Sequence, residues 1–177
     1  MFRIDSITED AAEGRVKAVY DDLRDSTGIV PNVFKVLSIW PEGLELYVAM
    51  FKTMMLDNTS LTRVVKEMIA ATVSRLNQCD YCLGHHQNFM TQYGISSEIS
   101  EQVVNDPQTA EISDGEKKLL TYVEKMTRHA YKVLDADIEA LKKVGWTHEQ
   151  ILEATLICAL FNALNRFADA LGVQPEA

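Results

Sequence analysis

The residues best suited to chemistry lie in the run Cys79-Asp-Tyr-Cys82-Leu-Gly-His-His86. On a helix, Cys79, Cys82 and His86 stand at positions i, i+3 and i+7 and share one face. The first spacing places the two cysteine Cα atoms roughly 5 Å apart, within the range that a disulfide can bridge. The imidazole of His86 can take a thiol proton or, when protonated, stabilise a thiolate. Two thiols that can form a disulfide beside a proton carrier are what reversible redox chemistry requires.

The same run admits other interpretations. A zinc site could use Cys79, Cys82, His85 and His86, but four ligands within eight helical residues do not easily surround one metal. The cysteines could also be small core hydrophobes with a structural role only. A c-type haem attachment needs histidine directly after the second cysteine, where Leu83 stands, and a thioredoxin fold needs a strand before the motif. Redox activity is the leading interpretation, while zinc binding and a structural role stay open.

Glu67 is the second candidate, on the helix expected just before the cysteines. Small residues near it would let another helix approach closely. If the helices expected at 61–76 and 79–93 pack antiparallel, the Glu67 carboxylate could reach the thiols, orient the imidazole or accept a proton. The alternative is a solvated glutamate paired with Arg63 or Lys66. Taken alone, the residues favour that alternative.

The elements that must position these residues are all predicted to be helices. Apolar residues recur at spacings of three and four, giving the segment 61–76 one broad apolar face, and no run alternates as a strand would. Capping boxes are expected over 113–116 and 147–150. If the helix that carries Cys79 and Cys82 begins near Asn77 or Gln78, Cys79 falls in its first turn. The helices are expected at about 8–25, 42–56, 61–76, 79–93, 97–105, 114–130, 135–144 and 148–171.

Composition narrows the class of protein. The 177 residues include 17 Lys and Arg against 26 Asp and Glu, a net charge of −9, which argues against nucleic-acid and anionic-membrane partners. Three cysteines are too few for a disulfide scaffold, and an odd number suits a reducing compartment. No secretory signal is visible, and the most apolar stretch, 154–164, is shorter than the roughly 20 residues of a membrane span. We expect a cytoplasmic protein in which 154–164 is a buried core helix.

The pattern E-x11-C-x2-C-x3-H, from Glu67 to His86, resembles the alkylhydroperoxidase D-like members of the carboxymuconolactone decarboxylase superfamily. Two further runs, Val30-Pro-Asn-Val-Phe34 and Asn165-Arg-Phe-Ala-Asp-Ala-Leu-Gly172, look like its peroxidase-related branch. The resemblance covers most of the chain. It implies one all-α domain over 1–177, a compact multi-helix bundle of helical hairpins with its core at about 42–130, which assembles as a homo-oligomer.

The resemblance also implies thiol-dependent peroxidase activity, an antioxidant role, without haem, flavin or metal. Cys82 would attack a hydroperoxide and become a sulfenic acid, and Cys79 would condense with it to a disulfide. His86 and Glu67 would form the proton relay, and a dithiol or redox protein would be the reductant. The best-known relative has histidine just before the second cysteine. Here Tyr81 stands at that place, and it can donate a hydrogen bond but cannot shuttle protons near neutral pH.

Two rival classes of function stay open. One is a cofactor-free decarboxylase or lyase of the same superfamily, whose pocket would bind a small carboxylate and whose chemistry does not need two thiols. The other is a non-enzymatic redox module, which would form a reversible disulfide without peroxide turnover. The third cysteine, Cys158, lies in an apolar run and is expected to be a buried, inert core thiol.

Overall fold

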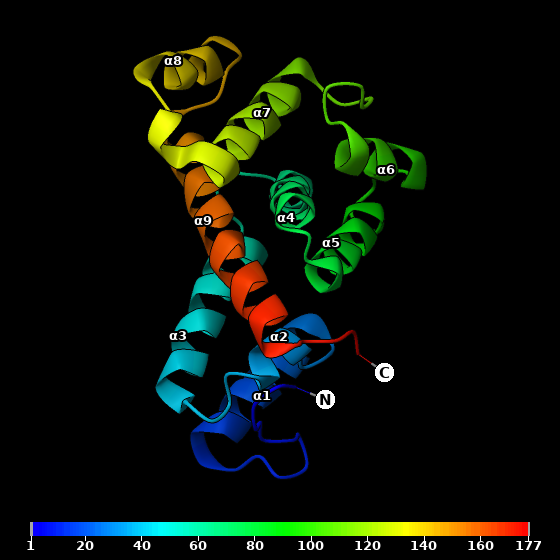
Figure 1. The fold of residues 1–177 in the computed structure, drawn as a ribbon, viewed down its shortest axis with the longest axis vertical. Coiled ribbons are helices and arrows are strands. Elements are labelled where there is room, and N and C mark those ends of the chain that lie inside the picture. The colour runs from blue at the N-terminus through cyan, green and yellow to red at the C-terminus, as the bar shows by residue number, and fades with distance from the viewer. Residues whose placement is uncertain (1, 177) are drawn as a thin grey trace. The chain divides into compact units, whose positions relative to one another are not determined.

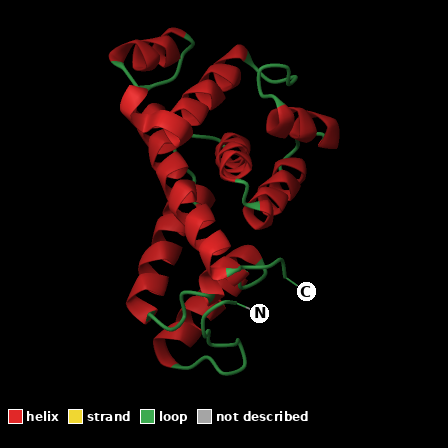
Figure 2. Cartoon of the chain, viewed as in Figure 1, coloured by secondary structure: helices red, strands yellow, loops and turns green. Residues whose placement is uncertain are grey.

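The structure is a computed structural model that describes residues 2–176. All regular elements within those residues are helical and no strand occurs among them (Figure 2), which confirms the all-α fold class. In chain order they are α1 (Gly14–Thr27), α2 (Asn32–Lys35), α3 (Pro41–Phe51), the π-helix η1 (Lys52–Leu56), α4 (Arg63–Asn77), α5 (Asp80–Gln92), α6 (Ser97–Asn105), α7 (Asp114–His129), the 3-10 helix η2 (Ala130–Lys132), α8 (Asp135–Lys143) and α9 (His148–Leu171).

The chain divides into two compact units. One comprises residues 2–53 with 167–176, and therefore α1 to α3 and the end of α9. The other is Met54–Arg166, which holds α4 to α8 and most of α9. Every residue singled out for chemistry in the sequence belongs to this second unit. The single domain expected over 1–177 stays a prediction.

Most element boundaries agree with the sequence-based expectation within two residues. The first helix is an exception, because a separate turn in which the Ala11 N–H donates to the Thr8 carbonyl at 3.2 Å precedes it and α1 begins only at Gly14. The helix expected over 42–56 is α3 followed by the π-helix η1. Sequence reasoning missed α2, which is too short to show a helical period. Both expected capping boxes form, over 113–116 and 147–150.

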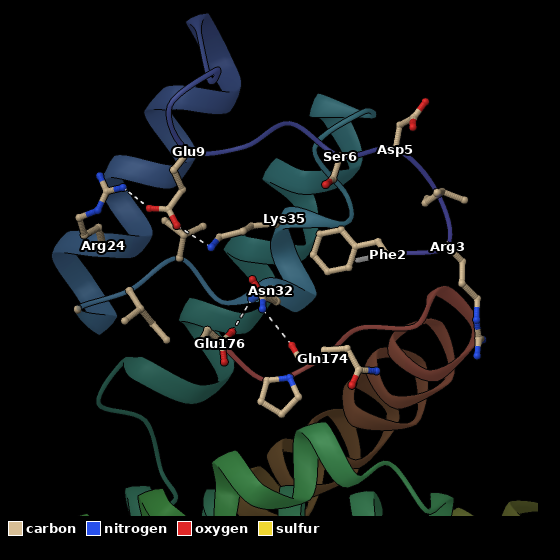
Figure 3. A pocket seen from close by; sticks show the side chains of 15 residues that line it. Phe2, Arg3, Asp5, Ser6, Glu9, Arg24, Asn32, Lys35, Gln174 and Glu176 are labelled. Carbon is tan, nitrogen blue, oxygen red and sulfur yellow. Dashed lines mark hydrogen bonds and ion pairs between the residues drawn. The ribbon is translucent and has the colours of Figure 1, made fainter.

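A cavity of about 860 Å³ lies in the first unit, between the N-terminal segment, the 28–32 turn and residues 174–176 (Figure 3). On the wall of this cavity, the Glu9 carboxylate forms ion pairs with both Arg24 and Lys35. The backbone N–H of Asn32 donates to the Glu176 carboxylate at 2.7 Å. The lining contains no cysteine or histidine, so the thiol chemistry indicated by the sequence has no group in this cavity.

In the second unit α4 is the central helix. The ten consecutive residues from Val65 to Ser74 are all buried, and the helix packs mainly against α5 and α7 (Figure 1). The sequence predicts one buried apolar face over 61–76. The structure buries more of the helix than that face, since neighbours cover it on every side. The reason lies in tertiary packing. Small side chains such as Ala70 and Ala71 let neighbours approach, and the buried polar side chains of Glu67 and Ser74 have hydrogen-bond partners on other helices.

Among residues 2–176, α9 is the helix that is long and apolar enough to cross a membrane by length and composition. The stretch 154–164 expected to be too short is part of this 24-residue helix. Half of its most apolar window is buried inside the protein, and core helices of soluble proteins pass the same test. Cys158, Phe161 and Leu164 within it are buried, which confirms the prediction of a core helix.

Candidate active site

The connection between α4 and α5 places the two cysteines. Gln78 adopts a left-handed conformation (φ 60°) after the end of α4, and the N–H of Cys79 donates to the Ser74 carbonyl at 3.0 Å. The chain thus reverses over Gln78 and Cys79, and α5 begins at Asp80. A helix start near Asn77 or Gln78 is wrong because α4 continues through Asn77.

The two cysteines therefore have different backbone environments. Cys79 is the N-cap residue of α5, and Cys82 is the third residue of the helix. The first-turn position expected for Cys79 is thus taken by Cys82. The first turn of a helix presents N–H groups without intrahelical partners, and with the macrodipole these favour a thiolate. Both residues are buried and neither is in a disulfide.

Glu67 and His86 meet inside the second unit. Glu67 is completely buried, and its Oε2 lies 2.5 Å from Nδ1 of His86. Its other oxygen, Oε1, accepts a hydrogen bond from Nε of Arg63 at 2.5 Å. The expectation of a solvated glutamate is wrong, although its pairing with Arg63 is confirmed. Lys66 turns to Glu153 and to the Asp57 carbonyl instead.

The charge state of this pair follows from its surroundings. Burial by itself raises the pKa of the Glu67 carboxyl, but attraction and hydrogen bonds from His86 and Arg63 outweigh it, so the pKa lies below its ordinary value. An ionised carboxylate only accepts hydrogen bonds, so Nδ1–H of His86 donates to Glu67 and a neutral ring keeps its lone pair on Nε2. Cys82 lies four residues before His86 on α5 and shares its face.

Aromatic rings fix the imidazole. The ring of Phe161, on α9, meets His86 edge to face with centroids 4.5 Å apart and an interplanar angle of 87°. Phe89, one turn further along α5, lies 6.3 Å from His86 between ring centroids. Phe161 was not a candidate in the sequence, since nothing in an apolar run marks the residue that touches a distant histidine.

Arg63 occupies a position between the buried pair and a cavity of about 320 Å³ lined by residues 55–62, Lys66 and Tyr93. Its guanidinium lies over the Tyr93 ring at 4.8 Å and over the Phe89 ring at 5.7 Å. One side chain therefore bonds to Glu67, lies over two aromatic rings of the segment 80–93, and lines this cavity.

A partly buried amide cluster joins α9 to the C-terminal end of α4. Nδ2 of Asn77 donates to Asn162 at 3.2 Å and to Asn165 at 3.0 Å, and Nδ2 of Asn165 donates to Oγ of Ser74 at 3.1 Å. Ser74 also accepts the Cys79 N–H through its carbonyl. The cluster thus holds the residues that immediately precede Cys79.

Cys158 is completely buried, as predicted, and burial raises the pKa of its thiol despite contacts with Thr127 and Asn162. Residues 2–176 contain no group of three or more His, Cys, Asp or Glu side chains placed to hold a metal ion.

Together the fold and the site define a class: an all-helical protein with a CxxC motif at the start of one helix and a buried carboxylate–imidazole pair joining that helix to its neighbour. The model of the carboxymuconolactone decarboxylase family matches residues 41–124. The chain is also similar to a peroxidase-related protein from Ralstonia eutropha JMP134 with an alkylhydroperoxidase AhpD core. The two are 28% identical with a TM-score of 0.90, over 99% of this chain and 92% of that one. The chain therefore resembles this family over its central helices and shares the alkylhydroperoxidase D-like fold of solved peroxidase-related proteins.

Two further relatives are more distant. Xenopus laevis Sestrin-1 is 22% identical over 93% of this chain, and the chain spans only 34% of Sestrin-1. The debrominase Bmp8 is 19% identical with a TM-score of 0.82, covering 97% of this chain and 91% of Bmp8, and so shares the fold.

Proposed function

We propose that the protein is a thiol-dependent peroxidase that reduces hydroperoxides through Cys79 and Cys82. The observation that carries the proposal is the buried Glu67 carboxyl bonded to Nδ1 of His86 at 2.5 Å, one helical turn from Cys82, with the pKa of Glu67 below its ordinary value. Such a pair orients the imidazole and leaves Nε2 to accept a proton. A proton acceptor beside a thiol at a helix start is what thiolate formation needs.

The proposed cycle balances in three steps. The Cys82 thiolate attacks one oxygen of the hydroperoxide, so that an S–O bond forms, the O–O bond breaks and the alcohol leaves with the proton held by His86. The Cys79 thiol then condenses with the Cys82 sulfenic acid, forming the disulfide and releasing water. An external dithiol or redox protein reduces this disulfide by thiol exchange and becomes a disulfide itself.

The two cysteines divide these roles by their places on α5. Cys82 lies in the first turn and on the His86 face, which suits the attacking thiolate. Cys79 lies at the N-cap, three residues before Cys82, a spacing that a disulfide can bridge, which suits the thiol that condenses with the Cys82 sulfenic acid. Tyr81 contributes a buried ring against His85 and no proton relay.

Similarity to an enzyme superfamily supports a catalytic function, but proteins of this fold differ in activity: Bmp8 is a debrominase. The rival assignments are a cofactor-free decarboxylase or lyase and a redox module without turnover. A decarboxylase or lyase needs no thiols. A redox module would be oxidised once and would not consume peroxide repeatedly. We further propose that the protein works in the cytoplasm as a homo-oligomer.

The test follows hydroperoxide consumption by the purified full chain with dithiothreitol as reductant. We expect turnover of hydrogen peroxide or cumene hydroperoxide that stops in Cys82→Ser. Cys79→Ser should retain the first oxidation and lose efficient turnover. Cys158→Ser is the matched control, since it also removes one buried thiol. Equal peroxide consumption by Cys82→Ser and the unaltered chain would show that the assignment is wrong.

A further inference from the structure

We propose that Arg63 is a positioning residue for the thiol chemistry: it holds the Glu67 carboxylate in the one orientation that keeps its second oxygen on His86. This inference rests on the proposed function, because it assigns Arg63 a role in activating Cys82. No pattern in the sequence marked Arg63 beyond its place four residues before Glu67.

The geometry of the carboxylate carries the argument. Glu67 has two oxygens and no access to solvent, and each oxygen accepts one hydrogen bond: Oε1 from Nε of Arg63, and Oε2 from Nδ1 of His86. Arg63 lies on α4 with Glu67, while His86 comes from α5. A carboxylate bound on one side only can rotate and present either oxygen to the imidazole. Bound on both sides, it fixes the imidazole plane and the direction in which Nε2 faces.

Arg63 is itself held in place. Its guanidinium lies over the rings of Tyr93 and Phe89, and these two rings belong to, or directly follow, α5. The side chain is about one-fifth exposed and lines the 320 Å³ cavity. A planar guanidinium can donate through Nε while its face rests on aromatic rings. The rounder ammonium of lysine cannot do both.

The positive charge of Arg63 supports the same role as its hydrogen bond to Glu67. The groups that act electrostatically on Glu67 are Arg63 on its own helix and His86 on α5. Because Arg63 lowers the pKa of Glu67, its removal makes the carboxyl easier to protonate. The pH at which Cys82 becomes half-reactive should then move upward.

The test measures alkylation of Cys82 by iodoacetamide across pH, by peptide mass spectrometry of the folded full chain. This readout does not depend on peroxide turnover, so it separates the failure of this inference from the failure of the proposed function. We expect Arg63→Gln to slow Cys82 alkylation about tenfold or more near neutral pH and to move the pH midpoint upward. Arg63→Lys should keep the midpoint nearer that of the unaltered chain but remain slower, because it keeps the charge and loses the planar donor.

Arg75→Gln is the matched control, since Arg75 lies on the same helix and pairs with Glu124 rather than with Glu67. It should leave both rate and midpoint unchanged. In a Glu67→Gln background, Arg63→Gln should add little further loss, because the two residues act as one unit. If Arg63→Gln proves too unstable to fold, Arg63→Lys against the control carries the test. An unchanged alkylation profile in Arg63→Lys and Arg63→Gln, or an equal change in Arg75→Gln, would overturn the inference.

Discussion

At the scale of the residue, the fully buried Glu67 carboxylate gives the site its chemical character. A buried charge is tolerated only when it is paired and hydrogen-bonded, and Glu67 has such a partner on each oxygen. His86 comes 19 residues after Glu67 in the sequence and lies on the next helix. The pairing therefore couples the orientation of the imidazole to the packing of α4 against α5.

Replacing Glu67 with glutamine should impair activity and stability together. Glutamine keeps the shape but loses the charge that His86 and Arg63 need, so the free energy of unfolding should fall by about 3 kcal/mol and peroxide consumption by about tenfold or more. Urea unfolding followed by circular dichroism and the peroxide assay measure the two effects. Unchanged activity in a folded Glu67→Gln protein would remove Glu67 from the relay.

The pH dependence of stability has a definite sign at this residue. Because the pKa of Glu67 is lower in the folded protein than its ordinary value of 4.5, its contribution is fully present above 4.5. It is lost as the pH falls through the lower, folded value. Unfolding curves of the unaltered chain should thus lose stability in that acid range, and the difference from Glu67→Gln should shrink there. A constant difference at all pH values would contradict the lowered pKa.

Cys158 should stay out of the redox chemistry. It is buried, and burial raises the pKa of its thiol more than the hydrogen bonds with Thr127 and Asn162 lower it, so thiolate formation is disfavoured. We expect Ellman's reagent to leave this thiol unmodified in the folded protein and to modify it in urea. Rapid reaction of Cys158 in the native state would show that this part of α9 opens readily.

At the scale of the element, the short link between α4 and α5 decides where each cysteine stands. The sequence predicts two helices here with bounds that are right within two residues. Because α5 begins at Asp80, this small difference places Cys79 at the N-cap rather than in the first turn. The sequence indicates only weakly where α4 ends, because Gln78 takes the left-handed conformation that glycine or asparagine more often adopts.

Gln78→Gly should therefore stabilise the protein. A side chain at φ 60° is strained and glycine is not, so the free energy of unfolding should rise by about 0.5–1 kcal/mol. Gln78→Val should lower it, since a branched side chain fits this conformation poorly. Chemical denaturation measures both. A loss of stability in Gln78→Gly would indicate that the glutamine side chain makes a contribution of its own.

The capping box of α7 offers a test of stability away from the site. Oγ of Ser113 accepts the N–H of Glu116, and the Glu116 carboxylate accepts the N–H of Ser113 at 2.8 Å. Ser113→Ala should cost about 1 kcal/mol and leave Cys82 alkylation unchanged. Thr147→Ala, in the corresponding box of α9, is the companion variant. A changed alkylation rate in Ser113→Ala would show that α7 influences the thiols.

At the scale of the whole molecule, both compact units leave large apolar side chains on the surface. Trp40 is 60% exposed in the first unit, and Tyr131 and Leu134 are 79% and 64% exposed in the second. Exposed apolar side chains that gather in one patch mark a surface that meets another protein, and we expect these residues to lie in such patches. The superfamily resemblance gives the same expectation, that of a homo-oligomer.

We therefore predict a particle larger than the 19.9 kDa chain. Light scattering after size-exclusion chromatography should return a whole multiple of this mass at micromolar concentration. Trp40→Ser and Leu134→Ser, tested separately, should reveal which unit contributes to the interface by lowering the mass. A monomer at all accessible concentrations would contradict the prediction.

The sequence by itself determined the helical class, most helix bounds and the two capping boxes, because each depends on spacing within about ten residues. It also predicted Cys79, Cys82 and His86 as a set, and the structure places Cys82 and His86 on α5 with Cys79 at its N-cap. It named Glu67 but favoured a solvated role for it, since local spacing pairs a helical glutamate with Arg63 and is silent on burial. Only the tertiary structure decided that α4 is covered on all sides, that Glu67 binds His86 as well as Arg63, and that Phe161 flanks the imidazole. These contacts join different helices, and their energies come from burial and desolvation, which no local pattern encodes.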